Sequence, residues 1–400
     1  MLLPAAAAAG PLAPVLQPLI DHHVVTGVVA LVADKDRVLD LESAGWSNQA
    51  DKKPMQNNDL FWIASMTKSI TATAFMMLVD EGKADINDPV EKYLPEFKGQ
   101  QVAEGKDHLH PHAPQHPITI KEVLSHTSGL LLPNDPAIKR TGSLKDEVAQ
   151  YGAIPLQREP GTKFEYNNTG IDTAGRIIEV LSGVPYADFV QTRLLGPLGM
   201  TDTSFWPKAE QARRMAASAR FNADKTGLEE IDFAKDLKPE VITRLSQGMK
   251  VPHELLVNFG VGKITDYTAR HAEPAGGLYS TAADVAKFCQ MLLNGGEMHG
   301  HRYLSEKALQ QMTSIETGEV PVNPQEGYGL GWFVKKNPNE GLSTGSYGHR
   351  GARRTVMWID PVQGLVIVLM VQRMDMTGEQ QKELYEGVMK AAGERFGKAR

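Results

Sequence analysis

The stretch GVVALVADKDRVLDLESAGWSN, residues 27–48, contains two strand-like runs on either side of a charged turn. β-Branched and alternating apolar residues in both runs, with a polar turn between them, predict a β-hairpin. Near the other end of the chain, four further short runs are aromatic or β-branched: YGLGWFVKK (328–336), GSYGHRG (345–351), RTVMWIDP (354–361) and GLVIVLMVQ (364–372). We therefore expect one antiparallel sheet that is built from both ends of the chain.

Helical patterns occupy most of the chain between these strands, and one more closes the sequence. They are ITIKEVLSHTSGL (118–130), TAGRIIEVLSG (173–183), PYADFVQTRLLGPLG (185–199), STAADVAKFCQMLLNGG (280–296) and GEQQKELYEGVMKAAGERF (378–396). Strands at both ends with helices in the middle favour an α/β fold of the α+β type, in which helices flank the antiparallel sheet. The expected organisation is a sheet domain from residues 1–87 and 276–400, with a mostly helical region, 88–275, inserted into it.

The composition is that of an ordinary globular protein, with 42% hydrophobic and 22% charged residues and a net charge of −6 over 400 residues. Basic residues are scattered, so we expect no nucleic-acid partner. No window approaches the roughly 18 consecutive apolar residues of a membrane span. The apolar start, MLLPAAAAAGPLAP, lacks a basic segment and fits either the remnant of an export signal or a flexible leader. The compartment is therefore open between the cytoplasm and the periplasm or exterior. We expect the single cysteine, Cys289, to be a buried small residue.

The stretch FWIASMTKSITATAFMMLVDEGK, residues 61–83, places Ser65 and Lys68 three positions apart at the start of an apolar helical pattern. Residues at this spacing share a helix face. A buried lysine with a lowered pKa can take the proton of a serine nucleophile, and the N–H groups of a first helical turn can stabilise an oxyanion. The competing interpretation is that Ser65 caps the helix and Lys68 extends to solvent.

Two more groups of polar residues fit the first interpretation. Tyr166 and Asn168 lie in a loop just before a helical pattern, where a tyrosine hydroxyl can relay a proton and an amide can hold a lysine and a substrate. His349 and Gly351 lie on a predicted strand that a ligand backbone can approach.

Together these motifs resemble a known superfamily. Ser65-x-x-Lys68, Tyr166-x-Asn168 and His349-x-Gly351 occur in the order and at about the spacing seen in class C serine β-lactamases, family VIII carboxylesterases and the related DD-peptidases and D-aminopeptidases. The likeness extends from about residue 25 to 371. It includes the segments LSHTSGL, GPLGMTDTSF and PAGGLYSTAADVAKF.

The resemblance implies a role for each matching residue. Ser65 would be acylated, Lys68 would be its base or proton relay, and Tyr166 would act as general base and acid. Asn168, His349 and Gly351 would bind substrate, and the backbone N–H groups of Ser65 and Ala352 would form the oxyanion hole. These last assignments complete the predicted site.

One position departs from the β-lactamase pattern. His349 stands where β-lactamases carry the lysine of Lys-Thr-Gly, and a neutral imidazole is not a fixed cation for a β-lactam carboxylate. Esterases and peptidases of the superfamily do show His-x-Gly, so the departure disfavours a β-lactamase more than a serine hydrolase. Arg350 either supplies the missing charge or is a strand residue that faces solvent, and the sequence leaves both open.

Other candidate sites are weaker. Ser343 lies in a literal G-x-S-x-G, but no helix follows it, so we expect a hairpin turn there. His108, His110, His112 and His116 are clustered among prolines, which favours an irregular loop over a zinc site. We predict no metal, and the absence of a dinucleotide or Walker A fingerprint predicts no cofactor. Trp332, Trp358 and Tyr347 are expected in the core, although one of them could line an acyl pocket.

The functional expectation is a carboxylesterase that cleaves small acyl esters through a Ser65 acyl-enzyme. An amide hydrolase with the same mechanism, either a β-lactamase or a D-amino-acid peptidase, is the nearest alternative. A non-catalytic ligand-binding or sensor module that keeps the fold is a more remote one.

Overall fold

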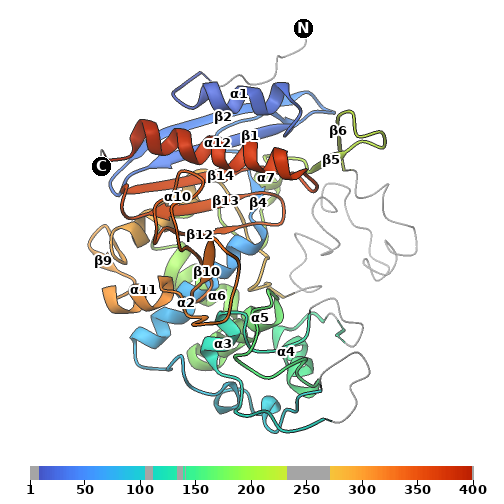
Figure 1. Cartoon of the computed structure of the whole chain (residues 1–400), viewed down its shortest axis with the longest axis vertical. Helices are drawn as coiled ribbons and strands as arrows, with labels where there is room; N and C mark the ends of the chain where they lie inside the picture. The colour runs from blue at the N-terminus through green and yellow to red at the C-terminus, as the bar shows by residue number, and fades with distance from the viewer. Residues whose placement is uncertain (1–8, 104–110, 133–137, 140, 232–270, 399–400) are drawn as a thin grey trace.

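The computed structural model describes residues 9–103, 111–132, 138–139, 141–231 and 271–398. Its main feature is an eight-stranded sheet in the order β10-β11-β12-β13-β14-β1-β2-β3, in which every neighbouring pair is antiparallel. Figure 1 shows the first and last strands of the chain side by side in this sheet. The strands are β1 (Gly27–Ala33), β2 (Val38–Asn48), β3 (Lys53–Pro54), β10 (Glu326–Tyr328), β11 (Phe333–Lys335), β12 (Tyr347–Arg350), β13 (Val356–Asp360) and β14 (Leu365–Met370).

The two ends of the chain meet in the middle of the sheet, where β1 pairs with β14. Val29 is opposite Met370 and Leu31 is opposite Val368. Both strands are buried along their whole length. Because side chains alternate across a strand, Val28, Ala30 and Val32 pack into one hydrophobic cluster, whereas Val29, Leu31 and Ala33 pack into another. The sequences of β1 and β14 are apolar at nearly every position because both faces of the sheet are covered. The expected sheet from both chain ends is confirmed.

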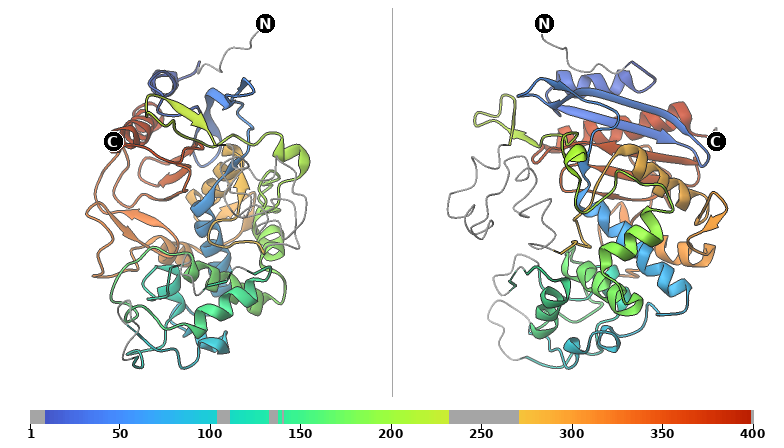
Figure 2. Two further views of the ribbon diagram at one scale, coloured as in Figure 1. Left: turned by 90° about the vertical axis from the view of Figure 1, so that its right-hand side faces the viewer. Right: turned by 180° about the vertical axis from the view of Figure 1, so that it is seen from behind.

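Helices cover the two faces of the sheet (Figure 2). Residues of α1 and α12 form one hydrophobic cluster with the sheet, and residues of α2, α5 and α10 form part of the other. The α-helices are α1 (Ala13–Asp21), α2 (Thr67–Asp80), α3 (Ile120–Leu124), α4 (Leu144–Ala153), α5 (Thr169–Ser182), α6 (Tyr186–Val190), α7 (Ala209–Ala212), α10 (Ala282–Leu293), α11 (Glu306–Thr313) and α12 (Gly378–Phe396).

Short elements join the larger ones. Strand pairs outside the main sheet are β4 (Phe61–Trp62) with β7 (Tyr279–Ser280), β5 (Ala219–Phe221) with β6 (Leu228–Glu230), and β8 (Glu297–Met298) with β9 (His301–Arg302). The 3₁₀ turns are η1 (Ala64–Met66), η2 (Val90–Lys92) and η3 (Pro95–Phe97), and a π-helical turn, η4 (Gln191–Leu195), follows α6.

Several smaller expectations are also met. Cys289 is fully buried in α10, and Trp332, Trp358 and Tyr347 all lie in the core. Within the described residues, no helix is both long and apolar enough to cross a membrane. The predicted inserted region, 88–275, lies partly outside the described residues, and its described part holds α3 to α7 together with the β5–β6 pair.

Candidate active site

Ser65 lies in η1, the 3₁₀ turn between β4 and α2, and not inside the α-helix that its sequence pattern suggested. The preceding residue, Ala64, has φ = +46°, a left-handed conformation that is unfavourable for a residue with a side chain. The turn is held in place from both sides, because Ile63 N donates to Leu278 O and Thr67 Oγ1 donates to Ala64 O. Ser65 is thus presented on a strained and well-braced turn just before α2.

Lys68 is completely buried, and its ammonium nitrogen has three polar neighbours. Lys68 Nζ lies 3.2 Å from Ser65 Oγ, 2.7 Å from Asn168 Oδ1 and 2.8 Å from the carbonyl oxygen of Ala275. Burial lowers the pKa of Lys68 to about 7, although the carboxylates of Asp172 and Glu273 act in the opposite direction. The interpretation of Lys68 as a solvent-reaching residue is therefore wrong.

The neighbours of Lys68 determine where its lone pair points when the amine is neutral. The oxygens of Asn168 and Ala275 can only accept hydrogen bonds, so they take the two N–H groups of a neutral amine. The remaining tetrahedral position of Nζ faces Ser65 Oγ, at 3.2 Å. A neutral Lys68 can therefore accept the hydroxyl proton of Ser65.

Tyr166 and Asn168 reach the same place from the loop that leads into α5. Asn168 is the residue before the first turn of α5, and its side chain is the one that binds Lys68. The Lys68 nitrogen lies 4.7 Å from the centre of the Tyr166 ring. Burial raises the pKa of Tyr166, and neighbouring Ser65 opposes this only in part. Tyr166 is consequently a neutral phenol at physiological pH.

The end of β12 lies against the Ser65 turn. A Cβ atom on Gly351 would come within 2.1 Å of Thr355 Oγ1 and 2.5 Å of Ile63 O, so only glycine fits there. Thr355 Oγ1 in turn donates to Ile63 O. Ala352 follows at an exposed position directly beyond this contact. The structure therefore brings the predicted oxyanion residues, Ser65 and Ala352, to adjoining segments.

His349 is buried on β12, and its ring centre is 6.0 Å from that of Tyr166. Burial, reinforced by the charge of Lys68, lowers the pKa of His349 to about 3. The imidazole is thus neutral, as expected from the sequence.

Arg350 has neither of the two roles that the sequence left open. Its guanidinium binds both carboxylate oxygens of Glu326, at 2.7 and 3.2 Å, and lies 3.5 Å from Glu340. The buried Lys335 binds the same two acids, at 2.9 and 2.7 Å. Although burial alone would raise it, the pKa of Glu326 falls to about 2 beside these cations. Arg350 is therefore an internal ion-pair residue, neither free for a substrate carboxylate nor simply turned to solvent.

Three residues near the site were not singled out from the sequence. Asp172 is buried on α5, one helical turn after Asn168, and accepts a hydrogen bond from Ala275 N. Its spacing from Asn168 was the available signal. His126 and Tyr328 are buried behind Tyr166, but no spacing rule connects these distant positions.

The rival serine and the histidine cluster do not form comparable sites. Ser343 lies in the turn between β11 and β12, as predicted, and its N–H donates to Asp360 Oδ2. His112 pairs with Glu159 and His116 with Glu122, whereas His108 and His110 lie outside the described residues. No group of three or more histidine, cysteine or acidic side chains in the described part of the chain could hold a metal ion.

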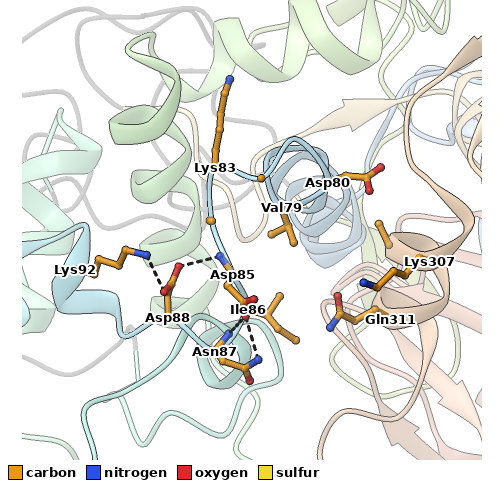
Figure 3. A pocket seen from close by; sticks show the side chains of 13 residues that line it. Val79, Asp80, Lys83, Asp85, Ile86, Asn87, Asp88, Lys92, Lys307 and Gln311 are labelled. Atoms are coloured by element: carbon orange, nitrogen blue, oxygen red, sulfur yellow. Dashed lines mark hydrogen bonds and ion pairs between the residues drawn. The ribbon is translucent and has the colours of Figure 1, made fainter.

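A polar cavity of about 520 Å³ lies at the far end of α2 (Figure 3). Its walls include Asp80, Asp85 and Lys307. Asp80 is 15 positions after Ser65, which corresponds to about 20 Å along a helix axis. This cavity is separate from the Ser65 site.

The sheet with its covering helices, and the contact of the half-buried Ser65 with the buried Lys68, define the β-lactamase and penicillin-binding type of serine hydrolase. The chain belongs to the β-lactamase family, whose family model matches residues 12–388.

Similar proteins carry several different names. An uncharacterized protein of Mycobacterium tuberculosis is 31% identical over 385 residues, covering 89% of this chain and 88% of that protein. A Salmonella agona protein, whose name proposes D-alanyl-D-alanine carboxypeptidase activity, is 28% identical over 373 residues, covering 86% of this chain and 78% of that protein. Among solved structures, EstCE1, described as a hydrolase with promiscuous acyltransferase activity, has a TM-score of 0.73 at 21% identity over 95% of this chain and 97% of its own. A mutant of simvastatin synthase from Aspergillus terreus has the same TM-score at 18% identity, with 96% of each chain covered. These two structures show the common fold.

Proposed function

We propose that the protein is a carboxylesterase that cleaves small acyl esters through an acyl-enzyme on Ser65. The observation that carries the proposal is the environment of Lys68, whose nitrogen has two acceptor-only partners and one remaining position, which faces Ser65 Oγ. With a pKa of about 7, a large fraction of Lys68 is neutral at physiological pH and can act as a base.

In the proposed acylation step, Ser65 Oγ attacks the ester carbonyl while its proton passes to Lys68 Nζ. The N–H groups of Ser65 and Ala352 stabilise the oxyanion of the tetrahedral intermediate. The C–O bond then breaks, and the leaving alkoxide takes the phenol proton of Tyr166, which Lys68 replaces. Asn168 keeps Lys68 in place and orients the substrate carbonyl.

Deacylation reverses these roles. The attacking water gives its proton to Tyr166 while Tyr166 passes its own phenol proton to Lys68 Nζ. When the second intermediate collapses, the Lys68 ammonium returns this proton to Ser65 Oγ. The cycle regenerates the starting protonation states.

Two features favour an ester over a substrate with an obligatory carboxylate. His349, at the position where β-lactamases carry a lysine, is buried and neutral. Arg350, the next residue, is bound to Glu326 and Glu340. Neither side chain offers a free cation to a β-lactam or to the end of a peptide, whereas an ester requires none.

Peptide hydrolysis by the same residues is the second candidate, because the Salmonella relative is named for a carboxypeptidase activity. The two candidates share the acyl-enzyme and differ only in the substrate. Turnover of p-nitrophenyl butyrate, compared with that of nitrocefin and of a D-alanyl-D-alanine peptide, separates them. We expect the ester to have a kcat/KM at least about 100-fold above both amides, and a preference for either amide would contradict the proposal.

The experiment that tests the site is labelling with a fluorophosphonate, followed by peptide mapping. We expect the adduct on the Ser65 peptide. Ser65→Ala and Lys68→Ala should each remove nearly all ester turnover, on the order of 10⁴-fold or more. Ser343→Ala is the matched control and should retain wild-type activity. An adduct on the Ser343 peptide, or an inactive but folded Ser343→Ala protein, would refute the site assignment.

A further inference from the structure

A chain of hydrogen bonds runs through the protein behind Tyr166. His126 Nε2 lies 3.1 Å from Tyr328 Oη, and Tyr328 Oη lies 3.2 Å from His349 Nε2. All three residues are buried, and they come from the loop after α3, from β10 and from β12. The chain therefore spans the space between two walls of the candidate site.

The hydrogen-bond chain ends at a backbone group on each side, and these two backbone groups determine the direction of every hydrogen bond in it. Asn167 N–H donates to His126 Nδ1, so that nitrogen carries no proton. The proton of His126 is therefore on Nε2, which donates to Tyr328 Oη, leaving the Tyr328 hydroxyl to donate to His349 Nε2. His349 Nδ1–H then donates to Arg350 O, at 2.9 Å. Each donor has one acceptor, and the two histidines are required to be opposite tautomers.

His126 also holds the backbone on both sides of Tyr166. Its carbonyl oxygen accepts from Glu165 N, and its Nδ1 accepts from Asn167 N. The backbone of His126 has φ = +61°, which is unfavourable for a residue with a side chain. Its ring centre is 4.5 Å from the Tyr166 ring. This strained histidine is thus in direct contact with the proposed acid–base residue.

The far end of the chain reaches the other half of the site. Arg350 O, which accepts from His349, immediately precedes Gly351 and Ala352. The pKa of His126 lies well below its ordinary value because of burial, and that of His349 is lowered to about 3. Neither histidine is charged near neutral pH, so the direction of the chain is constant over the working range.

We propose that Tyr328 is a positioning residue, which joins His126 to His349 and thereby fixes the Tyr166–Asn168 loop relative to Gly351 and Ala352, which follow β12 directly. The proposal rests on the proposed ester hydrolysis at Ser65. Tyr328 touches neither the substrate nor Ser65 in this role. It acts by fixing the orientation of Tyr166 between the nucleophile and the leaving group.

The kinetic test compares Tyr328→Phe with Tyr151→Phe. Each substitution removes one buried tyrosine hydroxyl, and Tyr151 donates to Glu147 on α4, which is not part of the hydrogen-bond chain from His126 to His349. With p-nitrophenyl butyrate, we expect kcat of Tyr328→Phe to fall about 10-fold or more while KM stays within about twofold, because misplaced catalytic groups slow chemistry more than binding. Tyr151→Phe should keep the wild-type kcat. Equal kcat values for the two variants would overturn the proposal and leave ester hydrolysis itself standing.

A second measurement tests the chain without relying on turnover. Protein with ¹⁵N-labelled histidine rings is examined by long-range ¹H–¹⁵N correlation NMR, and signals are assigned with His126→Asn and His349→Asn. We expect His126 as the Nε2–H tautomer and His349 as the Nδ1–H tautomer near neutral pH. The same tautomer at both positions, or a charged imidazolium with both ring nitrogens protonated at either position, would overturn the proposal. If wild-type protein hydrolyses no ester, the proposed function fails. The histidine tautomers alone then test whether the hydrogen-bond chain is present.

Discussion

Lys68 is the residue whose protonation state controls the proposed chemistry. Below its pKa of about 7 the ammonium has no lone pair, and above that pKa the neutral amine can accept the Ser65 proton. We therefore expect kcat/KM for p-nitrophenyl butyrate to rise by about 10-fold per pH unit below pH 7 and to level off above it. A pH–rate profile measures this acidic limb, the part of the curve that rises below pH 7, directly.

Asp172 should set the position of that limb. Its buried carboxylate raises the pKa of Lys68 against the effect of burial, so Asp172→Asn should lower this pKa and shift the acidic limb toward lower pH. The exposed Asp188→Asn serves as the control and should leave the profile in place. A limb that does not move, or that moves to higher pH, would show that Lys68 is not the titrating group.

At the residue scale, sequence reasoning found the residues whose spacing carries information. Ser65 with Lys68 and Tyr166 with Asn168 are short, ordered motifs, and the structure brings all four together. The partners of Arg350 and the neighbours of Tyr166 could not be found in this way. Glu326 reaches Arg350 across the sheet, from β10 to β12, and this contact depends on how the strands pair.

At the scale of elements, hydrophobic periodicity predicted the β1–β2 hairpin and the helices α5, α10 and α12. It did not predict that Ser65 lies in a 3₁₀ turn before α2. The left-handed conformation of Ala64 is imposed by neighbouring segments, since Ile63 is hydrogen-bonded to the chain near β7 and contacted by Gly351. Local sequence propensity cannot predict a backbone conformation that is imposed by such tertiary contacts.

The packing of β12 against η1 makes Gly351 critical for the site. Gly351→Ala should force the strand end away from Ile63, because the new Cβ would lie 2.1 Å from Thr355 Oγ1 and 2.5 Å from Ile63 O. We expect kcat for ester hydrolysis to fall about 10-fold or more and the melting temperature to drop. Gly387→Ala on α12 is the matched control. Its Cβ would meet no atom within 4 Å, and the added helix propensity should stabilise the protein by about 0.5–1 kcal/mol. Wild-type kcat in Gly351→Ala would contradict the proposed oxyanion hole.

At the scale of the whole molecule, the sequence indicated that the sheet is formed by the two ends of the chain. The β-branched and aromatic strand-like runs near both ends of the chain carried that information. The order of the eight strands is a different matter, because antiparallel strands with similar apolar faces can pair in many orders. Only the folded structure shows the order, in which strands that follow one another along the chain are neighbours and β14 pairs with β1.

The same packing predicts that the molecule unfolds as one cooperative unit. Leu31 on β1 is opposite Leu41 of β2 and Val368 of β14, and it belongs to the hydrophobic cluster that continues through α2 and α5. Leu31→Ala should therefore lower stability by about 2–5 kcal/mol, and helical circular dichroism and ester hydrolysis should be lost at the same lowered temperature. Val38→Ala, at the exposed start of β2, should change neither the stability nor the temperature at which activity is lost. If helical signal in Leu31→Ala persisted well above the temperature at which activity is lost, the helical part would be an independent folding unit and the continuous core would not couple it to the sheet.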